Sequence, residues 1–141
     1  MTSPAQTRRS FQLKLDMSTG VPAYRQIIDC ILGGISSGTL EPGEQLPTVR
    51  QLAVDLSINP NTVVRAYREL EIRGVLSTQQ GMGTFITNRK VKADNGQRQR
   101  RIAQLARDLL ARAGAEGITL DDLLEHLKEI KEEQKHEQRR V

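Results

Sequence analysis

The sequence predicts a mainly α-helical chain with one small β-hairpin, divided into a compact N-terminal domain and a short helical C-terminal region. Two observations support this fold class. Apolar residues recur at helical spacing in three segments before residue 75, and two strand-like runs then flank a glycine-rich turn within 75–87. After a polar stretch at 91–101, two more segments carry narrow apolar stripes at helical spacing.

The N-terminal domain is expected over 11–90, behind a polar tail at 1–10. The run at 11–16 alternates apolar and polar residues, which is the period of a half-buried strand. The first helix is predicted over 21–38, because Pro22 suits a first helical turn and Gly38 a helix end. Its apolar stripe consists of Tyr24, Ile27, Ile28, Ile31, Leu32 and Ile35.

A second and a third helix are predicted on either side of a three-residue turn, 57–59. Thr48 and Gln51 form a capping-box pattern at the start of the second helix. Asn59 suits the N-cap of the third helix and Pro60 its first position. The inward sides are Val49, Leu52, Ala53 and Leu56 in the second helix and Val63, Ala66, Tyr67 and Leu70 in the third. Followed by a hairpin, this order of elements is a winged helix-turn-helix.

The C-terminal region is expected to consist of a linker at 91–101 and two helices within 102–141. Thr119 and Asp122 form a second capping-box pattern at the start of the last helix. Leucines such as Leu105, Leu109 and Leu124 make stripes that are too narrow for a core of their own. The sequence therefore predicts a dimerisation region, in which these helices pair with a second copy of the chain.

Composition and charge narrow the classes of function. The net charge is +4, with +3 in residues 1–90, +3 in 91–101 and −2 in 102–141, which favours a nucleic-acid surface in the N-terminal part. Two Phe, two Tyr and no Trp are too few rings for a surface that stacks single-stranded bases. Cys30 is the only cysteine, so no internal disulfide can form, and a reducing, cytoplasmic location is expected. The absence of an apolar run of about 18 residues predicts no membrane span.

The helix-turn-helix segment from Val49 to Arg68 carries most of the candidate DNA-binding residues. In such a motif the second of the two helices enters the major groove, where Asn can read adenine and Arg can read guanine or bind phosphate. An arginine at the start of the preceding helix can bind a phosphate, and a glycine-containing wing can enter the minor groove. The candidates are Arg50, Asn59, Asn61, Thr62, Arg65, Arg68, Gly83 and Thr84.

Several candidates also have a purely structural interpretation. For Asn59 the helix cap is favoured over base reading. Gly83 would be needed by the hairpin turn whether or not DNA binds. A single exposed arginine is usually only a solvated charge, but Arg50, Arg65 and Arg68 together with two polar candidates favour DNA.

Residues 38–87 resemble the DNA-binding domain of the GntR family of transcription regulators. The resemblance rests on the segments from Gly38 to Pro47, from Thr62 to Glu71 and from Gly81 to Phe85, with an arginine at Arg50 between them. It extends over about residues 11–88. The short helical tail is similar to that of the YtrA subfamily of the same family.

The resemblance implies a homodimeric repressor that binds a palindromic operator in double-stranded DNA. It also implies control of a nearby operon that often encodes a transporter, together with the regulator's own gene. Release by a small-molecule effector, by an ion at the dimer interface, or regulation without any ligand are the alternatives left open. It assigns DNA contacts to Arg50, Asn61, Thr62, Arg65 and Gly83. Pro60 departs from the family pattern, in which this position is often Arg.

Two other classes of function compete with this interpretation. An enzyme is disfavoured, because the two histidines are ten residues apart and no phosphate loop or nucleophile motif is present. No catalytic residue, cofactor or metal site is expected. A winged helix used for protein docking is the other alternative, and it should lack the cationic side that Arg50, Arg65 and Arg68 provide.

Overall fold

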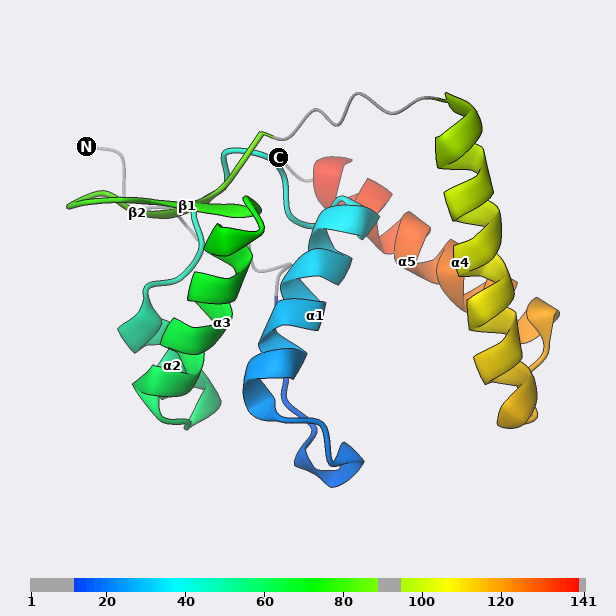
Figure 1. Cartoon of the computed structure of the whole chain (residues 1–141), viewed down its shortest axis with the longest axis horizontal. Helices are drawn as coiled ribbons and strands as arrows, with labels where there is room; N and C mark the ends of the chain where they lie inside the picture. The colour runs from blue at the N-terminus through cyan, green and yellow to red at the C-terminus, as the bar shows by residue number, and fades with distance from the viewer. Residues whose placement is uncertain (1–11, 89–94, 140–141) are drawn as a thin grey trace. The chain divides into compact units, whose positions relative to one another are not determined.

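The computed structural model describes residues 12–88 and 95–139 (Figure 1). The elements are a 3₁₀ turn at Met17–Thr19, α1 at Ala23–Ser37, α2 at Val49–Leu56, α3 at Pro60–Ile72, β1 at Leu76–Gln79, β2 at Gly83–Ile86, α4 at Asn95–Ala115 and α5 at Leu120–Arg139. The chain divides into two compact units, Met1–Arg89 and Lys90–Val141, which are described separately.

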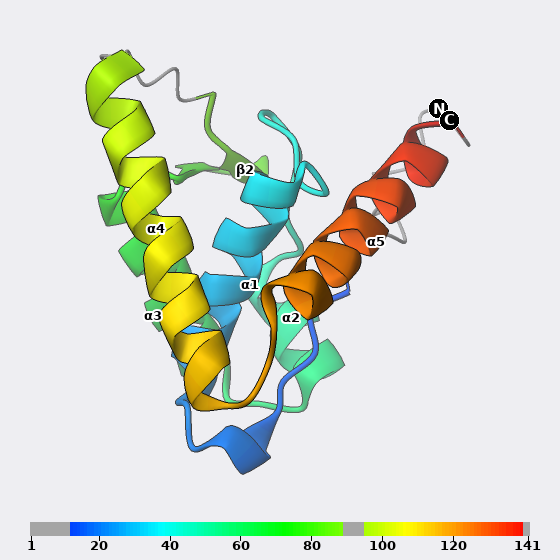
Figure 2. The ribbon, with the colours of Figure 1, turned by 90° about the vertical axis from the view of Figure 1, so that its right-hand side faces the viewer.

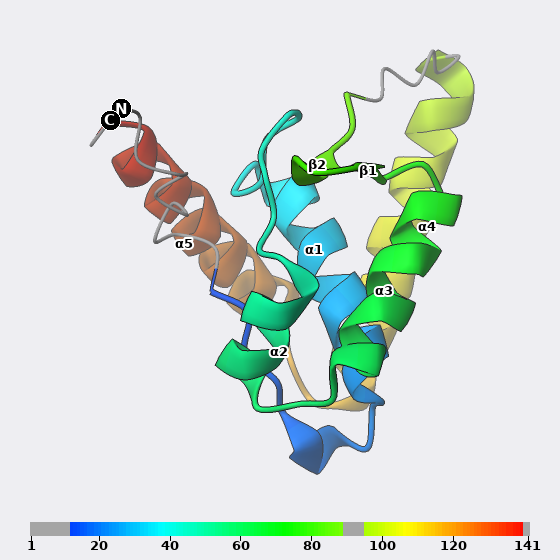
Figure 3. The same cartoon turned by 90° about the vertical axis from the view of Figure 1, so that its left-hand side faces the viewer.

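The core of the first unit lies between α1, α2, α3 and the hairpin, in agreement with the predicted apolar stripes (Figure 3). Ile27, Val63 and Leu70 are fully buried, and no buried side-chain nitrogen or oxygen of the described residues lacks a hydrogen bond. The remaining core residues are Ile28, Ile31, Leu40, Leu46, Leu52, Ala53, Ala66, Tyr67, Leu76 and Ile86. This core fixes which side of α3 faces outward.

The starts of α2 and α3 follow the predicted caps. Thr48 Oγ1 accepts from the Gln51 amide at 3.1 Å, and Gln51 Oε1 accepts from the Thr48 amide at 3.0 Å. Asn59 Oδ1 accepts from the Asn61 amide at 2.9 Å. The buried Tyr67 hydroxyl donates to the Pro47 carbonyl at 2.7 Å, so α3 is also anchored to the loop before α2. These bonds satisfy backbone groups that a helix end otherwise leaves unpaired.

The hairpin of β1, β2 and the turn 80–82, here called the wing, is antiparallel with Gln79 opposite Gly83. The loop before α2 lies along β2, because the Leu46 amide donates to the Thr84 carbonyl and the Ile86 amide to the Glu44 carbonyl, both at 2.9 Å. The wing is thereby attached to the helix-turn-helix through backbone hydrogen bonds.

The strand predicted at 11–16 does not form in the described part of that segment, and Phe11 lies outside it. Leu13 and Leu15 do pack against the core, so the alternation predicted correctly which side chains are partly buried. A strand partner is replaced by one side chain: Gln26 Oε1 accepts from the Asp16 amide at 2.8 Å, and Gln26 Nε2 donates to the Asp16 carbonyl at 2.9 Å. Alternation alone cannot distinguish a strand from an extended segment held in this way.

In the second unit α4 begins at Asn95, inside the segment 91–101 that was expected to be a linker. Residues 97–101 are all Gln or Arg, which favour helix without contributing an apolar period. The Thr119–Asp122 capping box is present: the Asp122 amide donates to Thr119 Oγ1 at 3.2 Å, and the Thr119 amide to Asp122 Oδ2 at 2.9 Å. From the connection at 116–119, α4 and α5 diverge (Figure 2).

Among the described residues, no helix is both long and apolar enough to cross a membrane.

Candidate nucleic-acid interface

The outward side of α3 carries amide and guanidinium groups. Because Val63, Ala66 and Tyr67 are buried in the core, Asn61, Arg65 and Arg68 are left exposed. Val64, Glu69 and Ile72 lie along the same side. Thr62, at the edge of this side, is half-buried. The structure therefore brings together four of the sequence-predicted residues on one helix.

Arg65 is held by an aromatic ring from α1. The guanidinium carbon lies 3.8 Å from the centroid of the Tyr24 ring. A guanidinium over the face of a tyrosine is attracted by the ring quadrupole, and its N–H groups remain able to donate at its edge. The sequence placed Tyr24 in the apolar stripe of the first helix and gave no signal for this role, which requires knowing how α1 crosses α3.

The positive charge on this side is not neutralised by neighbouring carboxylates. Glu69 pairs instead with Arg73, one turn further along α3, with 2.9 Å between Arg73 Nη2 and Glu69 Oε1. Within the described residues Arg50, Arg65 and Arg68 have no ion pair. Three unpaired guanidinium groups on a helix-turn-helix suit an anionic ligand such as the phosphates of DNA.

Arg50 and Asn59 stand at the starts of the two helices. Arg50 is exposed in the first turn of α2, which contains no acidic residue, so the positive end of the helix dipole adds to its charge. The Asn59 side-chain oxygen is used by the α3 cap, as the structural interpretation anticipated. A contact between Asn59 and a DNA base stays a prediction.

The wing tip presents two glycines with positive φ, +79° at Gly81 and +122° at Gly83. Gln45, which precedes α2, donates from Nε2 to the Met82 carbonyl at 3.0 Å. Thr84 is half-buried, and its hydroxyl lies 3.2 Å from that of Thr78. The contact from Gln45 was missed at the sequence level, because it joins positions far apart in the chain.

Burial explains the state of the Cys30 thiol and the Tyr67 hydroxyl, the two groups that nucleophilic or acid–base chemistry would use. Cys30 is half-buried, and desolvation raises the pKa of its thiol, which keeps it in the unreactive neutral form. Burial also raises the pKa of the Tyr67 hydroxyl, which is a core hydrogen-bond donor.

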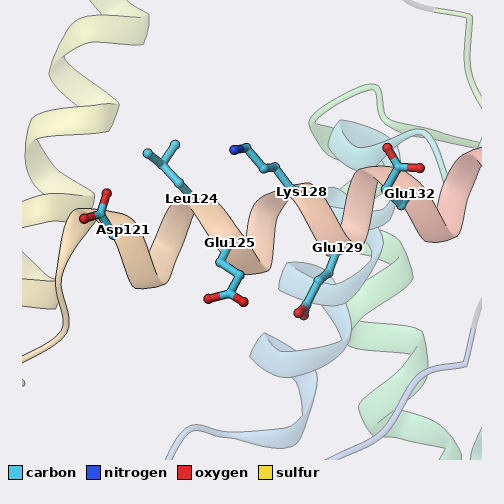
Figure 4. Close-up of a pocket in the computed structure, with 6 residues that line it drawn as sticks. All are labelled: Asp121, Leu124, Glu125, Lys128, Glu129 and Glu132. Carbon is cyan, nitrogen blue, oxygen red and sulfur yellow. The ribbon is translucent and has the colours of Figure 1, made fainter.

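A hollow along α5 has a negative net charge, opposite to that of the outward side of α3 (Figure 4). It is lined by Asp121, Leu124, Glu125, Lys128, Glu129 and Glu132. Four carboxylates and a single ammonium group would repel phosphate. No group of His, Cys, Asp or Glu side chains in the described ranges is arranged to hold a metal ion.

Comparison with known proteins gives a consistent result. The model of the family "Bacterial regulatory proteins, gntR family" matches residues 23–86, which span α1 to the end of β2. The HTH-type transcriptional repressor YtrA of Bacillus subtilis (strain 168) is 37% identical over 119 residues, covering 84% of this chain and 91% of the relative.

Solved structures extend the likeness beyond the winged helix. A GntR family transcriptional regulator from Listeria monocytogenes is 34% identical with a TM-score of 0.54, covering 82% of this chain and 98% of that one. YtrA from Sulfolobus acidocaldarius, a GntR-family transcription factor, is 33% identical with a TM-score of 0.52, covering 67% and 97%. These relatives are transcription regulators rather than enzymes. The chain therefore belongs to the GntR family of bacterial regulatory proteins, as a YtrA-type transcription regulator with a winged helix-turn-helix that binds DNA.

Proposed function

We propose that the chain is a homodimeric repressor that binds a palindromic operator in double-stranded DNA. The observation that carries this proposal is the outward side of α3, where Asn61, Arg65 and Arg68 are exposed and the guanidinium groups have no carboxylate partner among the described residues. The name of the similar Bacillus protein, a transcriptional repressor, supports repression as the direction of control.

In this proposal α3 reads the major groove. Asn61 and Thr62 lie in its first turn, which is the part of a recognition helix that contacts base edges. Arg65, one turn further on, is the proposed guanine reader, and Arg68 binds the backbone at the groove edge. Asn59 keeps its cap and contributes through its amide nitrogen.

Backbone contacts fix the register of α3 on the duplex. Arg50 and the start of α2 are proposed to bind one phosphate together. The wing, through Gly83 and Thr84, is proposed to follow the adjacent minor groove, where the missing side chain of glycine allows close approach.

The second unit supports the homodimer. Leu105 and Leu109 of α4 and Leu124 and Leu127 of α5 are 43–57% exposed in the single chain. Leucines that repeat on two adjacent helices and stay in water are typical of a surface that a second copy covers. Two copies related by a two-fold axis would present two recognition helices to two half-sites, which makes the operator palindromic.

The proposal also includes the kind of genes that the chain regulates and an effector that releases it from DNA. We expect an operon near the regulator's gene, with a transporter as the typical product, and a small effector that acts through residues 102–141. A protein that binds the chromosome in this way would work in the cytoplasm.

Selection and titration of duplex DNA test the proposal. The full chain is used to select binding duplexes from a random-sequence pool, and the selected duplex is titrated at increasing salt. We expect inverted-repeat sequences and a logarithmic salt slope of about −0.9 per phosphate contact. A flat salt response, or equal affinity for heparin and the selected duplex, would contradict specific binding of duplex DNA. Selected sequences without dyad symmetry would contradict the palindromic operator.

A further inference from the structure

One side chain from the loop before α2 holds the tip of the wing. Gln45 Nε2 donates to the Met82 carbonyl at 3.0 Å, and Gln45 faces Phe85 in an isolated antiparallel bridge. The neighbouring Leu46 amide donates to the Thr84 carbonyl at 2.9 Å. The backbone at Gln45 is thus fixed beside β2, and its side chain reaches the turn.

Gly83 leaves the space that this side chain occupies. A Cβ atom at position 83 would lie 2.5 Å from Gln45 Nε2 and 3.4 Å from Gln45 Cδ. Because the amide is the end of a flexible side chain, it would move aside rather than block folding, and the movement would break its bond to Met82. The φ of +122° at Gly83 adds a strain that any other residue would bear.

The remaining support of the tip is local. The Met82 amide donates to the Gln79 carbonyl at 2.9 Å, which closes the turn within the hairpin itself. Met82 is 66% exposed, so its side chain does not hold the tip by packing against the core. Without Gln45 the tip would keep its own turn but lose its connection to the helix-turn-helix.

We propose that Gln45 is a positioning residue for DNA binding, which holds the wing tip in the direction needed for the minor groove before DNA arrives. A loop that is already ordered loses less conformational freedom on binding, so the hydrogen bond raises affinity without Gln45 touching DNA. This inference rests on the proposed function, because the minor-groove contact of the wing is part of it.

The first experiment examines the free protein and needs no DNA. Backbone ¹⁵N relaxation is measured for Gly81, Met82 and Gly83 in the wild-type chain, in Gln45→Ala and in the control Gln12→Ala, which removes another exposed glutamine amide. We expect lower order parameters at the tip in Gln45→Ala alone, with an unchanged melting temperature. Unchanged order at the tip would overturn the inference.

The second experiment uses the duplex that the wild-type chain selects from the random pool. Gln45→Ala should bind it about three- to tenfold more weakly, as expected for one net hydrogen bond. Hydroxyl-radical protection of the minor-groove sugars should be lost, while methylation protection of guanine in the major groove is kept. Equal loss of both footprints would show a merely structural role and overturn the inference. If the wild-type chain selects no duplex, the proposed function fails, and the relaxation data still decide whether Gln45 holds the wing.

A third measurement couples the two positions. Gly83→Ala should weaken duplex binding more in the wild-type chain than in Gln45→Ala, because in the latter the clash with the Gln45 amide is absent, and only the backbone strain and the added methyl group at the groove remain. Equal weakening in both backgrounds would show that the Gln45 amide and residue 83 act independently, which contradicts the proposal.

Discussion

At the scale of single residues, the Tyr24 ring determines which part of the Arg65 guanidinium stays open to a ligand. With the guanidinium carbon 3.8 Å from the ring centroid, one face of the group is covered. Its edge N–H groups stay available for the two parallel hydrogen bonds that guanine accepts. A long side chain that is pre-organised in this way loses less rotamer freedom when it binds.

Replacing Arg65 tests this reading role. We expect Arg65→Ala to weaken binding to the selected duplex by about 1–3 kcal/mol and to relax the sequence preference at one base pair of each half-site. Binding to a panel of duplexes with single substitutions measures this. Equal weakening on every duplex would make Arg65 a phosphate contact instead.

Two Tyr24 variants separate the ring from the hydroxyl. Tyr24→Phe keeps the aromatic face and should retain the sequence preference, whereas Tyr24→Leu should lose part of it. If the two variants behave alike on the same duplex panel, the stacking does not position Arg65.

The two residues that sequence reasoning missed share one property. Tyr24 and Gln45 act on partners that lie far away in the chain, Arg65 and Met82 respectively. Residue type and local spacing cannot indicate such contacts, because they depend on how α1 crosses α3 and on how the loop before α2 lies along β2. By contrast, the exposure of Asn61, Arg65 and Arg68 followed directly from the buried period of α3.

At the scale of elements, local chemistry decided most of the secondary structure. The helix starts at Thr48, Asn59 and Thr119 were predicted from caps, and all three caps form. The prediction was wrong where periodicity was its only basis. The alternation at 11–16 predicted the burial of Leu13 and Leu15 correctly, but no strand forms in the described part of that segment. Because 91–101 has no apolar period, the first turns of α4 were predicted as a linker.

The capping box of α2 supports a stability prediction. Thr48→Ala removes the acceptor for the Gln51 amide, and we expect the free energy of unfolding to fall by about 1 kcal/mol in urea titration. Gln51→Ala in the Thr48→Ala background should have less effect than in the wild-type chain, because the two bonds form one motif. Ser36→Ala, at an exposed position of α1, is the control and should leave stability nearly unchanged.

The start of α5 supports a pH prediction. The Thr119 backbone amide, followed by its hydroxyl, holds the pKa of the Asp122 carboxyl below its usual value. A lowered pKa in the folded state stabilises the helix start at pH values above the ordinary carboxyl pKa, and this contribution disappears as the pH falls through the lowered value. Carbon-13 titration of Asp122 should show that Thr119→Ala raises this pKa part of the way. An unchanged pKa of Asp122 in this variant would show that the Thr119 hydroxyl does not help to lower it.

At the scale of the whole molecule, the two units differ in how completely they bury their apolar residues. The first unit has a core formed by α1, α2, α3 and the wing, and it presents Arg65 and Arg68 on the outward side of α3. The second unit buries Ala113 but leaves most of its leucines exposed, since α4 and α5 diverge instead of packing along each other (Figure 2). The sequence predicted the apolar stripes correctly, but the contacts within one chain do not determine what covers them.

Introducing charge into these stripes tests the homodimer. Burying one leucine side chain is worth about 1.5–3 kcal/mol, so a two-fold interface of several leucines per chain is strongly favoured. Leu109→Asp together with Leu124→Asp would place four carboxylates in that interface. We expect sedimentation to show monomers whose first unit still gives the wild-type amide spectrum. Gln99→Asp together with Gln134→Asp adds the same charge to α4 and α5 and should remain dimeric.

The double variant Leu109→Asp with Leu124→Asp also tests whether DNA binding depends on assembly. A monomer can occupy only one half-site at a time, so it loses the effective concentration that linkage gives to the second recognition helix. We expect most of the affinity for an inverted-repeat duplex to be lost, while the weak affinity for an isolated half-site is unchanged. If the leucine double variant stays dimeric, the interface lies outside α4 and α5. If it is monomeric and binds the full duplex as tightly as the wild-type chain, two-fold recognition of the operator is wrong.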